Sequence, residues 1–118
     1  MPRPADASWF LAIDRGEDPA GGPTVLLLSG RLGTDGARGL AHAVDVEIAA
    51  RNYNITLDLS GIDYVSSAGL AALSAAADAL RQAGGTLSLT RLQEPVRLAL
   101  SLSGPLEHVA LLDADASP

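Results

Sequence analysis

The chain has 118 residues, and 47% of them are hydrophobic, which is enough for one domain with its own core. It contains no cysteine, so it has no disulfide, no thiol nucleophile and no cysteine-based metal site. Its net charge of −6 repels a phosphate backbone, and an aromatic content of 3% leaves few rings for base stacking, so we expect no direct binding of nucleic acid.

The apolar pattern predicts an initial hairpin followed by alternating helices and strands. Two short apolar runs on either side of a segment rich in Gly, Pro and Asp indicate the paired strands. The first helix carries Leu40, Val44 and Ile48 at steps of four, and we expect Thr34 or Asp35 to cap it. The expected strands are 9–13, 25–28, 55–59, 86–90 and 108–112, and the expected helices are 34–51, 68–83 and one from Glu94-Pro95 to Gly104-Pro105.

This order of elements predicts an α/β fold. Strands that follow one another through helices pair in parallel, whereas the hairpin strands are antiparallel. We therefore expect a mixed four- to five-stranded sheet with about three helices packed beside it. The expected domain covers residues 9–112, with flexible ends at 1–8 and 113–118.

No segment approaches the roughly 18 to 20 apolar residues of a membrane span. The first eight residues also lack the apolar stretch of a secretory signal. These two features predict a cytoplasmic protein that does not insert into a membrane.

The most informative segment runs from residue 54 to residue 70, where a buried strand passes through a polar turn into a helix that begins near Ser66 and Ser67. The first N–H groups of a helix lack intrahelical partners, so a serine there commonly caps the helix. The same end carries a partial positive charge that tolerates a phosphate. The residue types alone leave both a capping role and a phosphorylation site open for Ser67.

Two carboxylates, Asp58 and Asp63, bracket an expected Ser60-Gly61 turn. Two such groups could hold Mg²⁺ or orient a hydroxyl, but an Asp near Gly commonly binds its own turn, which we expect for Asp63. Asp58 lies between two leucines, is shielded from water and needs a partner. We expect that partner to be a backbone N–H in the loop leading to Ser66, so that Asp58 fixes the loop presenting the serine.

Catalysis and metal binding find little support in the sequence. Ser67, His108 and Asp58 supply the residue types of a hydrolytic triad, but no Gly-x-Ser-x-Gly motif surrounds the serine. His42 has no second ligand at a suitable spacing except Asp45. We expect no catalytic residue, no metal site and no cofactor, and hence no enzyme activity.

The third expected helix has apolar residues on two sides. Val96, Ala99 and Leu100 form one face, and Leu98 and Leu102 lie nearly opposite. Two explanations stay open for the second pair: packing against the hairpin or the last strand, or a patch that faces a partner beside the serine-bearing helix.

Several motifs, taken in order, resemble the STAS domain family, whose best-known members are bacterial anti-anti-sigma factors. The similarity extends from about residue 9 to residue 112 and includes Gly30-Arg31-Leu32. The main segments are Leu-Asp-Leu-Ser at 57–60, Val-Ser-Ser-Ala-Gly-Leu at 65–70, Gly-Gly-Thr-Leu-Ser-Leu at 84–89 and Pro-Val-Arg-Leu-Ala-Leu-Ser-Leu-Ser-Gly at 95–104. The resemblance implies the same α/β fold as the apolar pattern.

At the site the family commonly reads Asp-Ser-Ser-Gly or Asp-Ser-Thr-Gly, and this chain has Ser66-Ser67-Ala68-Gly69. The resemblance implies that Ser67 is the serine presented to a serine kinase, that Ser66 replaces the acidic neighbour and that Asp58 matches the family's strand-end Asp. It implies a non-enzymatic switch: an antagonist that binds a serine-kinase-type anti-sigma factor and is rejected once Ser67 is phosphorylated, with a serine phosphatase restoring it.

Two other functions fit the same family. Small STAS subunits that dock on the ATPase of a lipid-trafficking ABC transporter often show a hydroxyl residue followed by Ala-Gly-Leu, as this chain does at residues 67–70. The replacement of the usual Asp by Ser66 also leaves open a STAS scaffold that is not phosphorylated.

Overall fold

The computed structural model describes residues 11–16, 24–103 and 109–112. The expected flexible ends, the hairpin loop after residue 16, Trp9 and His108 lie outside these ranges. The described elements are, in order, β1 (Leu11–Gly16), β2 (Thr24–Leu32), α1 (Thr34–Ala49), β3 (Asn54–Val65), α2 (Ser67–Gln82), β4 (Thr86–Thr90), α3 (Glu94–Ser103) and β5 (Val109–Leu112).

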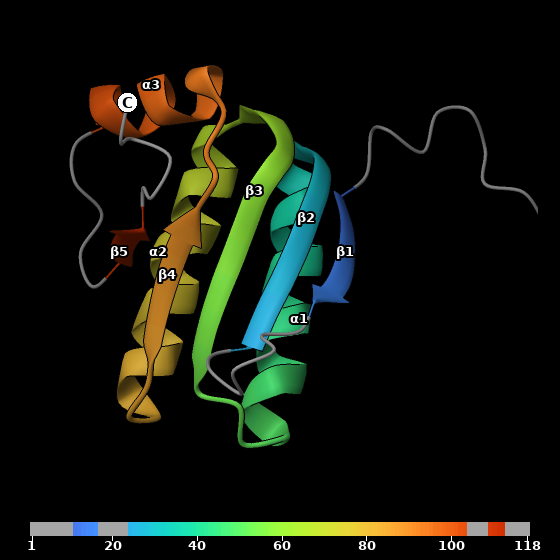
Figure 1. The fold of residues 1–118 in the computed structure, drawn as a ribbon, viewed down its shortest axis with the longest axis vertical. Helices are drawn as coiled ribbons and strands as arrows, with labels where there is room; N and C mark the ends of the chain where they lie inside the picture. Colours follow the sequence, from blue (N-terminus) through green and yellow to red (C-terminus); the bar gives the residue numbers. More distant parts are fainter. Residues whose placement is uncertain (1–10, 17–23, 104–108, 113–118) are drawn as a thin grey trace, which may run out of the picture.

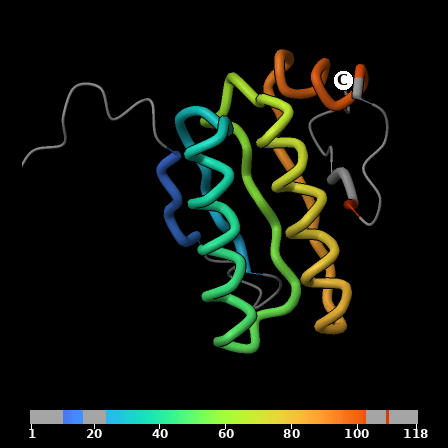
Figure 2. The backbone as a smooth tube through the Cα atoms, turned by 180° about the vertical axis from the view of Figure 1, so that it is seen from behind, coloured from blue at the N-terminus to red at the C-terminus, as the bar shows by residue number. Residues whose placement is uncertain are grey.

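The strands form one five-stranded mixed sheet in the order β1-β2-β3-β4-β5 (Figure 1). β1 pairs with β2 in the antiparallel sense, and the other three pairs are parallel. Helices α1 and α2 lie side by side on one face of the sheet (Figure 2), and α3 lies across the end where β3 and β4 finish. The predicted α/β fold is therefore confirmed.

The core fills the space between the sheet and the α1–α2 layer. Alternate residues of the central strands point toward the helices and are fully buried. The helices pack apolar side chains, spaced three and four residues apart, against them. Burying a Leu or Ile side chain contributes about 1.5 to 3 kcal/mol, so this layer accounts for most of the driving force for folding. The largest fully buried side chains are Leu28, Leu32, Leu40, Val44, Ile55, Leu57, Leu59, Ile62, Leu73, Leu80, Leu87 and Leu89.

Strands β2 and β3 are longer than predicted. The prediction of a turn at Ser60-Gly61 is wrong, because both residues lie within β3. Leu27 pairs with Asp58 but Ser29 pairs with Gly61, so two residues of β3 face one residue of β2. A second irregularity of the same kind follows before Leu32. These are β-bulges, which place locally turn-forming residues inside a continuous strand and increase its twist.

Helix α1 begins at Thr34 as predicted, but neither Thr34 nor Asp35 caps it. Gly33 is the N-cap residue and makes no side-chain cap hydrogen bond. Asp35 lies in the first turn, where its negative charge interacts favourably with the helix dipole. The helix ends at Ala49, and Arg51 leaves it with a φ of 69°, which explains why the helix is shorter than its sequence pattern.

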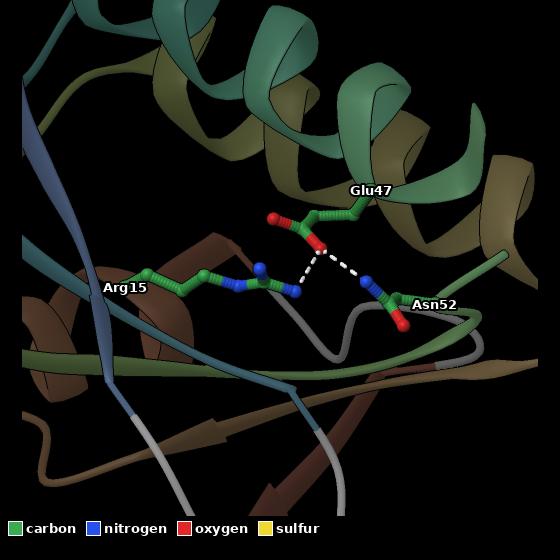
Figure 3. Close-up of polar contacts among 3 residues, drawn as sticks. All are labelled: Arg15, Glu47 and Asn52. Atoms are coloured by element: carbon green, nitrogen blue, oxygen red, sulfur yellow. Dashed lines mark hydrogen bonds and ion pairs between the residues drawn. The ribbon is translucent and has the colours of Figure 1, made fainter. Parts of the chain in front are cut away.

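A nearly buried carboxylate joins the hairpin to α1 (Figure 3). Glu47 is 8% exposed, and its Oε1 accepts hydrogen bonds from Arg15 Nη2 at 3.0 Å and from Asn52 Nδ2 at 2.8 Å. The Arg15 side chain stays 57% exposed, so its head remains largely hydrated while it pairs with Glu47. The two donors offset the loss of hydration that burial imposes on the carboxylate.

Candidate functional site

The two serines at the N-terminus of α2 have different structural roles. Ser66 is the N-cap residue, and its Oγ accepts a hydrogen bond from the Gly69 N–H at 3.2 Å. Its backbone N–H donates to the Leu32 carbonyl at 3.0 Å, and its hydroxyl donates to the same oxygen at 3.5 Å. The hydrogen bonds of Ser66 thus connect the start of α2 to the end of β2. The capping role considered for Ser67 belongs to Ser66.

Ser67 is the first residue of α2, one position earlier than the predicted start of the helix. Its side chain is exposed, whereas Ser66 is half-buried. The hydroxyl of Ser67 therefore stands at the positive end of a 16-residue helix and is open to an incoming protein. This position suits both a phosphate and an enzyme that delivers one.

Gly69 allows α2 to begin this close to the sheet. It is buried, and a Cβ at position 69 would overlap the carbonyl oxygen of Leu32 and lie 2.9 Å from Leu32 Cγ. Only a residue without a side chain fits between the first turn of α2 and the end of β2. Ala68 is half-buried beside it. Gly69 thus sets how close the first turn of α2 lies to the end of β2.

Asp58 supports a different part of the structure from the one predicted. It lies within β3, seven residues before the strand ends, and is 8% exposed. Its Oδ1 accepts from the Ser60 N–H at 2.9 Å, and its Oδ2 lies 3.8 Å from Arg91 Nε. Asp58 therefore binds the backbone of the first β-bulge, and not an N–H in the loop leading to Ser66 as predicted. Asp63 is exposed on β3 rather than bound in a turn.

The loop from β4 to α3 is tied to the same bulge. Gln93 Nε2 donates to the Ser60 carbonyl at 2.6 Å, and Arg91 approaches Asp58 from the same loop. Since β3 and β4 are parallel neighbours, α2 and α3 both begin at the carboxyl edge of the sheet. The start of α2 and the start of α3 therefore belong to one edge of the molecule, as Figure 1 shows.

Helix α3 buries one side and exposes the other. Val96 and Leu100 are 0% and 8% exposed, whereas Leu98 and Leu102 are 55% and 79% exposed. Within residues 11–16, 24–103 and 109–112, these exposures exclude the packing of Leu98 and Leu102 against the hairpin or the last strand. We call this pair the α3 patch.

An exposed arginine and tyrosine stack beside the start of α2. The guanidinium carbon of Arg31 lies 4.6 Å from the centroid of the Tyr64 ring. Both residues line an open hollow with Gly30, Gly61 and Asp63, which lie around the two β-bulges of β3. This pair could not be predicted from the sequence. The strand ends predicted at residues 28 and 59 leave both residues outside the strands, and only the folded sheet brings them together.

The described residues give no geometry for a triad or a metal site. Asp58 is bound to the bulge and to Arg91, and His108 lies outside the described ranges. Among the described residues there is no group of three or more His, Asp or Glu side chains that could hold a metal ion. His42 is exposed on α1. None of the described helices is long and apolar enough to cross a membrane.

The family model described as "Mlab, STAS domain" matches residues 16–112. The chain belongs to the STAS domain family. Among curated relatives, "Putative anti-sigma factor antagonist BtrV" of Bordetella bronchiseptica is 32% identical to this STAS domain over 87 residues, which cover 74% of this chain and 75% of the relative.

Solved structures share the STAS fold at lower identity. An anti-sigma factor antagonist from Mycobacterium paratuberculosis is 22% identical with a TM-score of 0.71, over 86% of this chain and 84% of that chain. The unphosphorylated form of the anti-sigma factor antagonist SpoIIAA is 16% identical with a TM-score of 0.63, over 86% and 88%. The phosphorylated form of SpoIIAA, a cell fate determinant of Bacillus, is 15% identical with a TM-score of 0.62, over 90% and 96%.

Proposed function

We propose that this STAS domain is an anti-sigma factor antagonist whose binding is controlled by phosphorylation of Ser67. The proposal rests on the start of α2, where the Ser66 hydroxyl caps the helix and the Ser67 hydroxyl is exposed on the first turn. The relative named as an anti-sigma factor antagonist supports the class of function. In this scheme the protein is not an enzyme and acts in the cytoplasm.

The partner in this proposal is an anti-sigma factor that is also a serine kinase, and a serine phosphatase reverses the modification. The unphosphorylated domain binds the anti-sigma factor, and the phosphorylated domain is rejected. A phosphate adds about 1.5 to 2 negative charges at pH 7. The N-terminus of α2 stabilises this charge within the domain, but the same charge opposes docking of any surface that fits the bare hydroxyl.

The test of the modification uses three proteins: the wild type, Ser67→Ala and Ser66→Asp. Each is incubated with ATP and with each purified kinase-like anti-sigma factor that the source genome encodes. The position of the incorporated phosphate is mapped by mass spectrometry. We expect label on Ser67 in the wild type, none in Ser67→Ala, and equal or greater label in Ser66→Asp. Aspartate preserves a capping acceptor at position 66 and adds up to about 1 kcal/mol of favourable interaction with the helix dipole.

Ser66→Asp is the matched control because it removes the neighbouring hydroxyl without removing the cap. Label on Ser66 in the wild type, or label that persists in Ser67→Ala, would contradict the assignment. A folded Ser66→Asp protein that no longer accepts phosphate would show that the Ser66 hydroxyl has a role beyond capping.

The α3 patch is the second contact that we propose for the partner. Leu98 and Leu102 lie on the helix that starts at the same edge as α2, and both are well exposed. The two leucines are four residues apart on one side of the helix and form an apolar patch, and exposed apolar patches mark interaction sites. A partner that covers Ser67 and spreads along this edge would bury them.

The test of the patch compares Leu98→Arg with Val46→Arg. The two side chains are 55% and 50% exposed and lie on α3 and α1, so both substitutions put an arginine at a similarly open position. We expect Leu98→Arg to weaken binding of the anti-sigma factor by several-fold or more and Val46→Arg to leave it unchanged, with melting temperatures within a few degrees of the wild type. Equal affinities for the two variants, measured by calorimetry, would remove the patch from the interface.

A second candidate function rests on residues 67–70, Ser-Ala-Gly-Leu, which resemble the motif of STAS subunits that dock on the ATPase of a lipid-trafficking ABC transporter. In that function, as in a STAS scaffold without phosphorylation, the exposed Ser67 is a contact residue and not a substrate. Both predict no label from any kinase. Binding of the unmodified protein to a transporter ATPase, lost in Ser67→Asp, would favour the transporter subunit.

A further inference from the structure

Within the part of the chain that the structure describes, one weak contact joins Arg31 and Tyr64. Tyr64 is 43% exposed and Arg31 is exposed, with the guanidinium 4.6 Å from the ring centroid. A cation–π contact at such an open position contributes about 0.5 to 1 kcal/mol. The guanidinium can therefore leave the ring whenever a stronger acceptor comes within reach.

The pair lies next to the turn that carries the serines. Leu32, the neighbour of Arg31, accepts the backbone N–H of Ser66 at 3.0 Å. A Cβ at position 33 would lie 3.8 Å from Tyr64 Cε2 and 4.0 Å from Ser66 Oγ. Since residue 33 is glycine, it places no side chain between the ring and Ser66. Tyr64 and Ser66 therefore both lie close to position 33, and a guanidinium that leaves the ring is released close to the first turn of α2.

The other charged groups of this edge make Arg31 the favoured partner of a phosphate there. Asp35 and Glu94 lie in the first turns of α1 and α3, and Asp63 lines the hollow beside Arg31. These three carboxylates repel a phosphate on Ser67, so its favoured partner is a cation of this edge. Among the cations, Arg91 is paired with Asp58, as described above, and Arg97 Nη2 donates to the Leu92 carbonyl at 3.4 Å.

We propose that Arg31 moves from Tyr64 to the phosphate when Ser67 is phosphorylated, so that the modification also uncovers the Tyr64 ring. Guanidinium–phosphate contacts are charge-assisted and frequently bidentate, and they are stronger than a cation–π contact in water. The proposal rests on Ser67 as the modified residue. It gives phosphorylation two effects on one surface, because a charge appears on α2 and an aromatic face appears on β3.

The experiment introduces phosphoserine at position 67 during translation, so it does not depend on a kinase. The second pKa of the phosphate, about 6 in an unperturbed phosphoserine, is measured by ³¹P NMR titration. We expect the phosphate pKa to be higher in Arg31→Ala than in the wild type by about 0.5 units or more, because a nearby cation favours the dianion. Arg81→Ala is the matched control, since Arg81 lies at the far end of α2, roughly 20 Å away at 1.5 Å per residue.

A second readout follows the Tyr64 ring. Its proton shifts should change on phosphorylation of the wild type and should not change on phosphorylation of Arg31→Ala. An unchanged phosphate pKa in Arg31→Ala would overturn the proposal. So would an equal rise in Arg38→Ala, because the phosphate pKa would then respond to the loss of any positive charge and not to Arg31 in particular. Absence of kinase labelling would contradict the proposed function and leave this contact intact.

Discussion

Replacing Gly69 with alanine is expected to lower the free energy of unfolding by about 2 to 4 kcal/mol and the melting temperature by roughly 10 to 20 °C. The new Cβ would overlap the Leu32 carbonyl oxygen, which belongs to backbone and cannot turn away. The first turn of α2 would have to move away from β2. That movement would break the hydrogen bonds that Ser66 makes with the same carbonyl.

Gly39→Ala is the matched control for this substitution. Gly39 is also helical, but nothing lies within 4 Å of a Cβ at that position of α1. Alanine is the better helix former there, so the free energy of unfolding should rise by about 0.5 to 1 kcal/mol. Thermal and urea unfolding of both variants give the comparison. A Gly69→Ala protein as stable as the wild type would show that α2 can start farther from β2 than the structure shows.

The helices and the buried strand cores could be predicted because each is set by residues close together in sequence. Leu40 and Val44 mark the buried side of α1, and both are buried in the structure. The strand ends could not be predicted in the same way. Ser60-Gly61 has the composition of a turn, but pairing with β2 holds it inside β3 as a bulge. Tertiary contacts therefore decide the length of this strand.

In the candidate site, too, the local features could be predicted and the long-range contacts could not. A serine at the start of α2 follows from the local pattern, and the family motif assigns it to Ser67. The cap is local, because it joins Ser66 to the N–H group three residues on, and a capping serine at this helix start is expected from the sequence. The anchor to β2 could not be predicted, because Leu32 is 34 residues from Ser66 and meets it only in the folded sheet. The Glu47–Arg15 ion pair joins residues 32 apart, and no local pattern places a carboxylate on the buried side of a helix.

Phosphorylation of Ser67 is expected to weaken binding of the anti-sigma factor by at least about 100-fold, which corresponds to roughly 2.7 kcal/mol. The phosphate must either lose its hydration inside the interface or hold the two surfaces apart, and both raise the free energy of the complex. Ser67→Asp carries one negative charge and should weaken binding by a smaller factor. Ser67→Ala adds no charge and should bind as the wild type does. Calorimetric titration of the same anti-sigma factor measures all four proteins.

Gln82→Glu is the control that separates position from net charge. It adds one negative charge to the exposed last residue of α2, whereas Ser67→Asp adds one to the first residue of the same helix. If the charge acts within the interface, Ser67→Asp weakens binding and Gln82→Glu does not, because the far end of the helix lies beyond the screening length of about 8 to 10 Å at ordinary salt. Equal losses in the two variants would mean that long-range repulsion governs the affinity. The exposed hydroxyl at the start of α2 would then have no special place in the switch.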